Sequence, residues 1–375
     1  MDNYHQMTER SLGQRSDTLE ERGLLKSWRQ DLSSSPVHVR NQSDHPNYWA
    51  QQPSSLISTS NITSLNIGTG ASIYESLRPT LETVSHELII VTCFWARSET
   101  QTNVASILRT LSAKGQRSGH KIRVRIYFSS CSLWQKIFHT FSRDGKIYAP
   151  ESWPSTFGLP TTEELAGLDL QIKSVFFLPF SVMHPKFIIL DRKHVFLPSC
   201  NISWEDWFEG CVGMTGPIVD QFITFWLRFW ATPGDRAAHF PYNDASETGD
   251  FELGSDTAAS DDHDSHEQGS SLPIAKSLQL TNIKTIFLPS PHHINPLFRF
   301  PWQDPAPPPP TPLNTFLLRA IATASSSIYI QTPNLTSAPV ISALLDAVTR
   351  GVSLHIITSE RLMVLEQLVL SLIHI

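Results

Sequence analysis

Five residues whose side chains could handle a phosphate group lie within one short stretch of the sequence: His184, Lys186, Asp191, Ser199 and Asn201. A neutral imidazole can attack phosphorus or move a proton, and its ordinary pKa lies near working pH. A lysine offers positive charge to the non-bridging oxygens, where charge builds in the transition state. A hydroxyl and an amide can hold a second oxygen. Because the lysine stabilises the charge, this set predicts a reaction that needs no metal ion or other cofactor.

These residues lie on a predicted β-hairpin. Its parts are an apolar run of strand length, a polar turn and a second apolar run, at 184–190, 191–194 and 195–197. Side chains alternate between the faces of a strand, so His184 and Lys186 should project to the same side. The same spacing relates the serine and the asparagine on the returning limb. We expect Asp191 to close the turn beside these groups.

The spacing His-x-Lys, four residues, Asp, and then Ser-x-Asn resembles the signature of the phospholipase D superfamily, in its fungal type. The family's HKD core and its downstream Ser and Asn are matched here by His184, Lys186, Asp191, Ser199 and Asn201. One position departs from the pattern. Pro198 stands where the family usually has Gly, and because proline lacks a backbone N–H, it cannot donate to a phosphate there.

The resemblance implies a phosphodiesterase that works through a phosphohistidine. His184 is then the nucleophile or the acid and base, and Lys186 is the phosphate clamp. Asp191 is implied as an electrostatic and orienting partner, and Ser199 and Asn201 as donors that hold oxygen. The favoured substrate is a glycerophospholipid, and nucleic acid is the alternative.

The family carries two HKD motifs, one in each lobe, that face each other across one active site. This sequence carries one, because neither His355 nor His374 is followed two residues later by Lys. Three interpretations stay open. Two chains could pair as a homodimer, the chain could be a truncated product, or it could be a non-catalytic module that binds phosphodiesters.

Composition and pattern predict a layered α/β protein, and the resemblance implies two sheet-and-helix lobes, the second of them truncated. The expected parts are a disordered tail, a first lobe with the motif, an acidic disordered linker and a partial second lobe without a motif, at 1–62, 63–242, 243–271 and 272–375. The linker holds nine acidic residues and no Lys or Arg, so the net charge of −6 becomes +3 for the rest of the chain. A mildly basic folded part is compatible with a phosphate-bearing substrate.

The two lobes show the same expected order of strand, helix and strand. In the first lobe, helices are expected at 72–85, 103–114 and 133–141 and strands at 86–96, 121–130 and 168–177. In the second, helices are expected at 313–325, 339–350 and 361–370 and strands at 327–336 and 352–359. The proline-rich run 301–312 should be an extended spacer. The repeated order indicates an internal duplication.

Several conspicuous features are interpreted as structural. Residues 66–72 are Gly-rich but lack the Walker lysine, so a turn leading into a helix is favoured. The aromatic run 222–230 should be a buried helix. Arg123 and Arg125 share one face of a strand and should be edge or solvated charges, not substrate ligands.

The acidic pair Glu205 and Asp206 should likewise lie at the surface, because adjacent side chains point apart. Trp204 and Glu209 are expected at the edge of the active site, because residues after the Ser-x-Asn element line it in resembling proteins.

The four cysteines show no paired or metal-type spacing, so they should be reduced thiols of an intracellular protein. No signal peptide or membrane span is expected, since the N-terminus is polar and the longest aromatic run is too short. The predicted location is the cytoplasm or the periphery of a membrane.

Overall fold

The computed structural model describes residues 19–34, 49, 52–131, 145–177, 181–237, 274–276, 278–291, 310–332, 335 and 337–358. The acidic linker, the expected helices at 133–141 and 361–370, and nearly all of the proline-rich run lie outside these residues.

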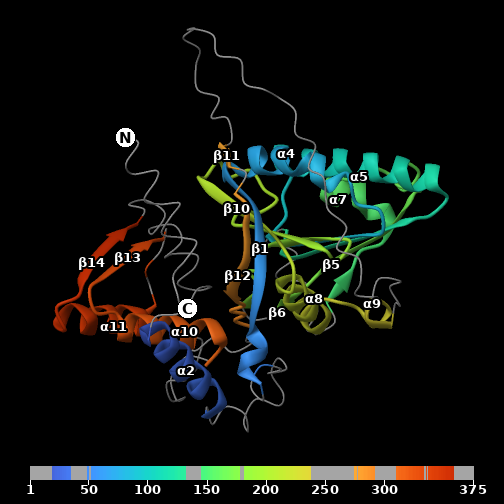
Figure 1. The fold of residues 1–375 in the computed structure, drawn as a ribbon. Coiled ribbons are helices and arrows are strands. Elements are labelled where there is room, and N and C mark those ends of the chain that lie inside the picture. The colour runs from blue at the N-terminus through green and yellow to red at the C-terminus, as the bar shows by residue number, and fades with distance from the viewer. Residues whose placement is uncertain are drawn as a thin grey trace, which may run out of the picture.

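A large mixed sheet organises most of the described chain (Figure 1). Its strands lie in the order β11-β1-β10-β9-β8-β2-β3-β5-β4, and β12 also pairs with β1. Their bounds are β1 Ile57–Gly68, β2 Glu87–Phe94, β3 Ile122–Ser130, β4 Lys146–Ile147, β5 Leu168–Ser174, β8 Phe187–Leu190, β9 His194–Pro198, β10 Glu209–Thr215, β11 Ile274–Lys276 and β12 Leu280–Ile286. β2, β3 and β5 are parallel, and the other pairings in this sheet are antiparallel. The predicted α/β class is confirmed.

Helices cover both faces of this sheet. The first face is covered by α4 (Gly70–Leu81) and α5 (Glu99–Ser118), and the second by α8 (Ile218–Phe229) (Figure 1). The short elements are η1 Pro53–Leu56, η2 Pro150–Ser152, α7 Trp153–Phe157, α9 Pro233–Ala237, and the β6 and β7 pair, Phe176–Phe177 and Ser181–Val182. The buried helix expected at 222–230 is confirmed in α8.

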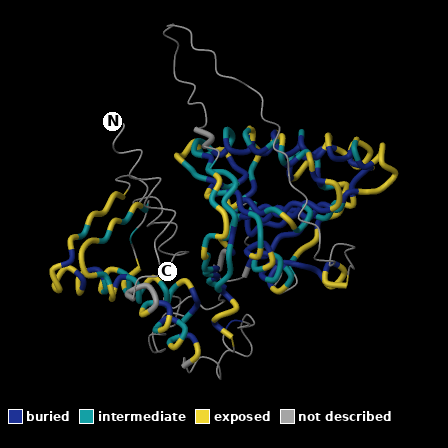
Figure 2. The backbone as a smooth tube through the Cα atoms, viewed as in Figure 1, coloured by how far each residue is buried: buried dark blue, intermediate teal, exposed yellow. Residues whose placement is uncertain are grey.

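The strand β2 shows why the sheet is covered on both sides. Its sequence ELIIVTCF is almost continuously apolar, and a strand with two buried faces needs such a run. Leu88 and Ile90 belong to the core under α4 and α5, whereas Ile89 and Val91 belong to the core under α8. The dark centre of the sheet in Figure 2 reflects this two-sided burial.

Side chains fix where α4 and α5 begin. The hydroxyl of Thr69 accepts a hydrogen bond from the N–H of Ser72, and that of Ser98 accepts one from the N–H of Gln101. These N-caps satisfy amides that a helix cannot pair internally. The Gly-rich segment 66–72 is therefore the end of β1 and the start of α4. The helix was predicted, and the strand before it was not.

A second, smaller unit contains α10 (Pro312–Thr323), β13 (Ser327–Gln331), α11 (Ala338–Thr349) and β14 (Ser353–Ile357). β13 and β14 are parallel, and the order helix, strand, helix, strand is the same as in α4, β2, α5 and β3. The predicted repetition of elements is thus confirmed. This unit has a small core of its own, and its strands are largely exposed (Figure 2).

The N-terminal tail, predicted to be disordered apart from a short helix at 18–28, contains more structure than that. Helix α2 (Leu19–Ser34) packs against α10, where the Trp28 indole N–H donates to the carbonyl of Pro312 at 3.1 Å. Asp31 pairs with Arg319 in the same contact. Strand β1 begins at Ile57, so ordered structure starts before the boundary expected at residue 63.

Candidate functional site

The predicted hairpin is present. β8 and β9 are antiparallel, and Leu190 lies opposite His194. Asp191 and Arg192 have positive φ, and the N–H of Lys193 donates to the carbonyl of Leu190 at 2.9 Å. These are features of a type I′ turn, the kind that suits the twist of a hairpin. Regular pairing in β8 begins at Phe187, so His184 and Lys186 lie in the extended segment before it.

The site lies at one edge of the large sheet. Because Val91 lies opposite Phe187 in antiparallel register, the segment before β8 lies beside the carboxyl end of β2. Ser199 and Asn201 follow the end of β9, and Glu209 begins β10. In open α/β sheets, ligands bind beyond the carboxyl ends of parallel strands. The motif therefore lies at the end of the sheet where ligands commonly bind.

His184 and Lys186 lie next to each other. The Nζ of Lys186 is 3.4 Å from the Nδ1 of His184, the imidazole is exposed, and the lysine is half-buried. Burial of the ammonium lowers the pKa of Lys186, and the nearby Cys93 and Glu209 act in the opposite direction. A partly desolvated ammonium attracts a phosphate oxygen more strongly than a solvated one does.

Ser199 is joined to Glu209 and Gly210. Its hydroxyl donates to the Oε2 of Glu209 and accepts from the N–H of Gly210 at 2.9 Å. The N–H of Ser199 also donates to the carbonyl of Gly210 at 2.8 Å. The serine oxygen is thereby fixed, and Glu209 places a carboxylate near Lys186.

Asn201 joins the hairpin to the end of β2. Its Oδ1 accepts the N–H of Phe94 at 3.2 Å, and Ile202 forms an isolated bridge with Trp95. With the acceptor oxygen engaged, the side-chain NH2 is the part of Asn201 that can donate to a ligand. It makes no hydrogen bond with any other described residue.

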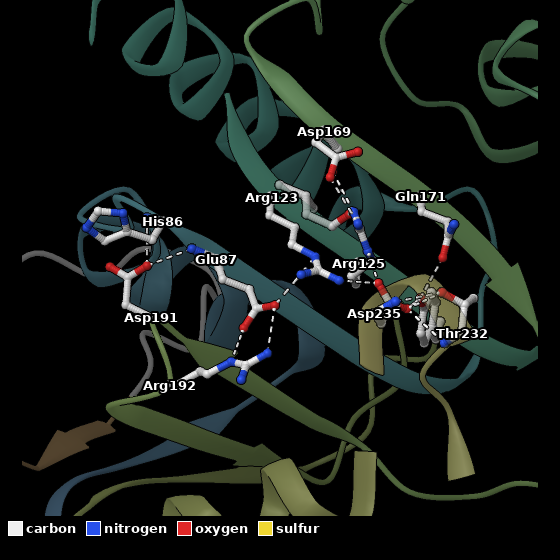
Figure 3. A network of polar contacts seen from close by, with 12 residues as sticks. His86, Glu87, Arg123, Arg125, Asp169, Gln171, Asp191, Arg192, Thr232 and Asp235 are labelled. Atoms are coloured by element: carbon white, nitrogen blue, oxygen red, sulfur yellow. Dashed lines mark hydrogen bonds and ion pairs between the residues drawn. The ribbon is translucent and has the colours of Figure 1, made fainter. Parts of the chain in front are cut away.

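Asp191 lies away from the other four residues. It occupies the hairpin turn, as predicted, but at the end of β8 opposite to Lys186. Five residues of extended chain span about 15 Å. The Asp191 carboxylate accepts the backbone N–H groups of Ser85, His86 and Glu87 at 2.8–2.9 Å, at the start of β2 (Figure 3). In this position it stabilises the hairpin against β2 and does not lie beside His184.

The prediction that Arg123 and Arg125 are edge or solvated charges is wrong, since β3 lies between β2 and β5 and both side chains are largely buried. Both guanidinium groups donate to the Oδ1 of Asp235, which is 2% exposed (Figure 3). Asp235 also accepts from the hydroxyl of Tyr127 and from Thr232. Burial by itself would raise the pKa of Asp235, but the hydrogen bonds led by that from Arg125 hold it well below its usual range.

Glu87 extends the same polar network toward the hairpin. Arg192, next to Asp191 in the turn, pairs with the Glu87 carboxylate at 2.7 Å, and Arg123 lies 3.7 Å from it (Figure 3). The network therefore stabilises the edge of the sheet opposite to His184. We assign it a structural role.

The two residues predicted at the edge of the site differ in their surroundings. Glu209 contacts Ser199, whereas the side chain of Trp204 is 66% exposed in the loop 203–208. Glu205 accepts from the hydroxyl of Ser203, and Asp206 is exposed, as expected of surface acids. The exposure of Trp207 and Phe208 in this loop was not predicted, because aromatic residues in a sequence are first candidates for a core.

The described residues contain no group of three or more His, Cys, Asp or Glu side chains arranged to hold a metal ion. No helix among them has the length and apolar character required to cross a bilayer.

Comparison with known proteins gave distant structural likenesses only. The sequence matches no protein-family model and no curated protein. A phospholipase D family member, Nuc from Salmonella typhimurium, is 11% identical, with a TM-score of 0.30 over 46% of this chain and 94% of its own. NucT from Helicobacter pylori is 13% identical, with a TM-score of 0.28 over 44% of this chain and 94% of its own. Polyphosphate kinase from Porphyromonas gingivalis is 11% identical, with a TM-score of 0.35 over 76% of this chain and 36% of its own. At these values, neither a family nor an activity follows from the likenesses.

Proposed function

We propose that this chain is a phosphodiesterase of the phospholipase D type that acts on a glycerophospholipid. The observation that carries the proposal is the contact between His184 and Lys186, 3.4 Å apart, at the carboxyl end of β2. Ser199 and Asn201 follow β9 at the same edge of the sheet. A nucleophile, a cation and two neutral donors are the groups that a phosphoryl transfer requires.

In the proposed mechanism, the Nε2 of His184 attacks phosphorus from the tautomer that carries its proton on Nδ1, and the Lys186 ammonium, 3.4 Å from Nδ1, turns to the phosphate oxygens. The P–N bond forms as the P–O bond to the leaving alcohol breaks, and the alcohol leaves after taking a proton from an acid. Water then attacks phosphorus and gives its proton to the conjugate base of that acid, and the P–N bond breaks to regenerate the imidazole. Lys186 and the amide of Asn201 stabilise the charge on the non-bridging oxygens. Ser199, held by Glu209, donates its hydroxyl to the same group once phosphate displaces that contact.

The sequence carries one HKD motif, so the acid that protonates the leaving alcohol has to come from outside this motif. A homodimer related by two-fold symmetry would place the partner subunit's His184 opposite the first. A nuclease with one motif per chain would complete its active site through such a homodimer. The same single motif also favours a second candidate function, a phosphodiester-binding protein that does not turn its ligand over.

Turnover in the presence of chelator tests these alternatives. The purified chain and a His184→Ala variant are compared on phosphatidylcholine vesicles, on DNA and on bis-p-nitrophenyl phosphate. We expect vesicle hydrolysis that survives chelation and falls at least about a thousandfold in the variant. Hydrolysis of DNA alone would favour the nuclease. Binding without turnover in either protein would favour the non-catalytic module.

A further inference from the structure

The loop 203–208 concentrates exposed aromatic surface beside the candidate site. Trp204, Trp207 and Phe208 are 66%, 43% and 78% exposed. Among the described residues, the only other exposed large aromatic side chain is Tyr329 in β13. Exposed apolar residues gathered in one place mark an interaction surface, whereas scattered ones carry no such meaning.

Both ends of this loop are fixed to the site. At the start, Ile202 is fully buried, and its carbonyl accepts the N–H of Ala96 at 2.9 Å. At the end, Glu209 accepts from Ser199 and lies at the start of β10. The aromatic side chains therefore have a defined position relative to Ser199 and Asn201.

The charge of the loop indicates which kind of surface it can bind. Residues 203–209 contain Glu205, Asp206 and Glu209 and no Lys or Arg. Nucleic acids and anionic bilayers both attract basic segments, so a segment with three carboxylates is poorly suited to either. A zwitterionic bilayer carries no net charge, and tryptophan favours the headgroup level of a bilayer, where one side of the ring is apolar and the other is wet.

We propose that residues 203–208 are an interfacial anchor that seats the site on a zwitterionic phospholipid surface. The proposal rests on the proposed function and specifies how the lipid is reached. With aromatic rings at the headgroup level, the adjoining His184, Lys186, Ser199 and Asn201 lie at the depth of the phosphodiester. The substrate class that follows is a phospholipid with a zwitterionic headgroup, such as phosphatidylcholine.

Sedimentation of the full chain with phosphatidylcholine vesicles tests the anchor directly. The variant is Trp207→Ser with Phe208→Ser, and the matched control is Tyr329→Ser, which removes an equally exposed ring from β13. We expect the double variant to lose about tenfold or more in vesicle partitioning. Trp204→Ser should lower it further, and the Tyr329 control should equal the wild type. Failure of the wild type to associate, or equal association of the double variant, would overturn the proposal.

A second readout leaves the aromatic surface in place. Trp204→Phe with Trp207→Phe removes two of the ten tryptophans but keeps apolar rings. Brominated phosphatidylcholine should quench the fluorescence of the wild type more strongly than that of this variant. Equal quenching would contradict insertion of this loop, and aromatic-dependent binding of single-stranded DNA in place of vesicles would replace the anchor with a base-stacking surface.

Failure of the anchor and failure of catalysis give different results. Association that depends on the aromatic rings but comes without turnover would retain the anchor and reject the enzyme. Turnover of soluble bis-p-nitrophenyl phosphate without vesicle association would reject the anchor and retain the enzyme. His184→Ala should abolish turnover.

Discussion

The carboxylate of Asp191 accepts the backbone N–H of Glu87 at 2.8 Å, at the edge of the sheet opposite to His184. Through this contact, and those from Ser85 and His86, the hairpin turn is attached to the start of β2. The His and the Asp of the motif thus lie beyond opposite ends of the four-residue strand β8.

Substitution of Asp191 should lower the stability of the fold. Asp191→Ala leaves three backbone N–H groups without their charged acceptor, and we expect a loss of about 3 kcal/mol in the free energy of unfolding. Asp191→Asn keeps one acceptor oxygen and should lose less. Urea unfolding followed by circular dichroism measures both. Equal stability of Asp191→Ala and wild type would mean that the turn is held by its backbone alone.

Removal of Asp235 should be more damaging than removal of its neighbour Asp169, although both pair with Arg125. Asp235 is 2% exposed, and Asp235→Ala leaves the buried guanidinium groups of Arg123 and Arg125 without it, at a cost of about 3–5 kcal/mol. The side chain of Asp169 is 58% exposed, so Asp169→Ala should cost below about 1 kcal/mol. Thermal and urea unfolding of the two variants provide the comparison, and similar losses would contradict a buried network centred on Asp235.

His194 should make the fold less stable in mild acid. Burial lowers its pKa to about 4, while its Nε2 contacts the hydroxyl of Thr63 at 3.0 Å. Between pH 6.5 and about 4, His194 is protonated in the unfolded chain but neutral in the folded chain. The free energy of unfolding therefore falls as the pH falls. The full shift corresponds to about 3 kcal/mol.

The variant that tests this effect is His194→Phe, which keeps a ring against Phe196, 4.3 Å away in the wild type. Relative to wild type, its unfolding free energy should depend less on pH between 4 and 6.5. Asp235 has a lowered pKa in the folded chain, so its ionised form stabilises the fold at pH values above its unfolded pKa. The stability that is lost in acid when Asp235 is protonated should be the same in both proteins. Parallel pH profiles would show that His194 does not titrate in this way.

The alkaline limit of turnover should report Lys186. Since burial lowers the pKa of this ammonium, its positive charge, and with it the phosphate clamp, should be lost at a pH below the ordinary lysine value of 10.5. The measurement is kcat/KM against pH on a soluble phosphodiester. Lys186→Arg, which stays charged, should remove this limb from whatever turnover it retains. An unchanged limb in that variant would assign the titration to another group.

Local pattern predicted much of this molecule. The apolar runs of β2, β8 and β9, and the polar turn between the last two, specify strands and a hairpin without reference to the rest of the chain. The spacing in the motif likewise predicted that His184 and Lys186 would be neighbours.

Long-range contacts could not be predicted in this way. The partner that buries Arg123 and Arg125 is Asp235, more than one hundred residues later, so these arginines resemble solvated charges in the sequence. The position of Asp191 follows from pairing with β2, about one hundred residues earlier. The exposure of Trp207 and Phe208 depends on a loop with no periodic pattern.

Trapping of the covalent intermediate shows whether His184 is the nucleophile. The chain is mixed with a 32P-labelled phosphodiester in chelator and quenched in alkali, where a P–N bond to histidine survives, and the labelled peptide is identified by mass spectrometry. We expect label on His184 that acid releases and that is absent from His184→Ala. Turnover without label on His184, or turnover that persists in His184→Ala, would rule out His184 as the nucleophile.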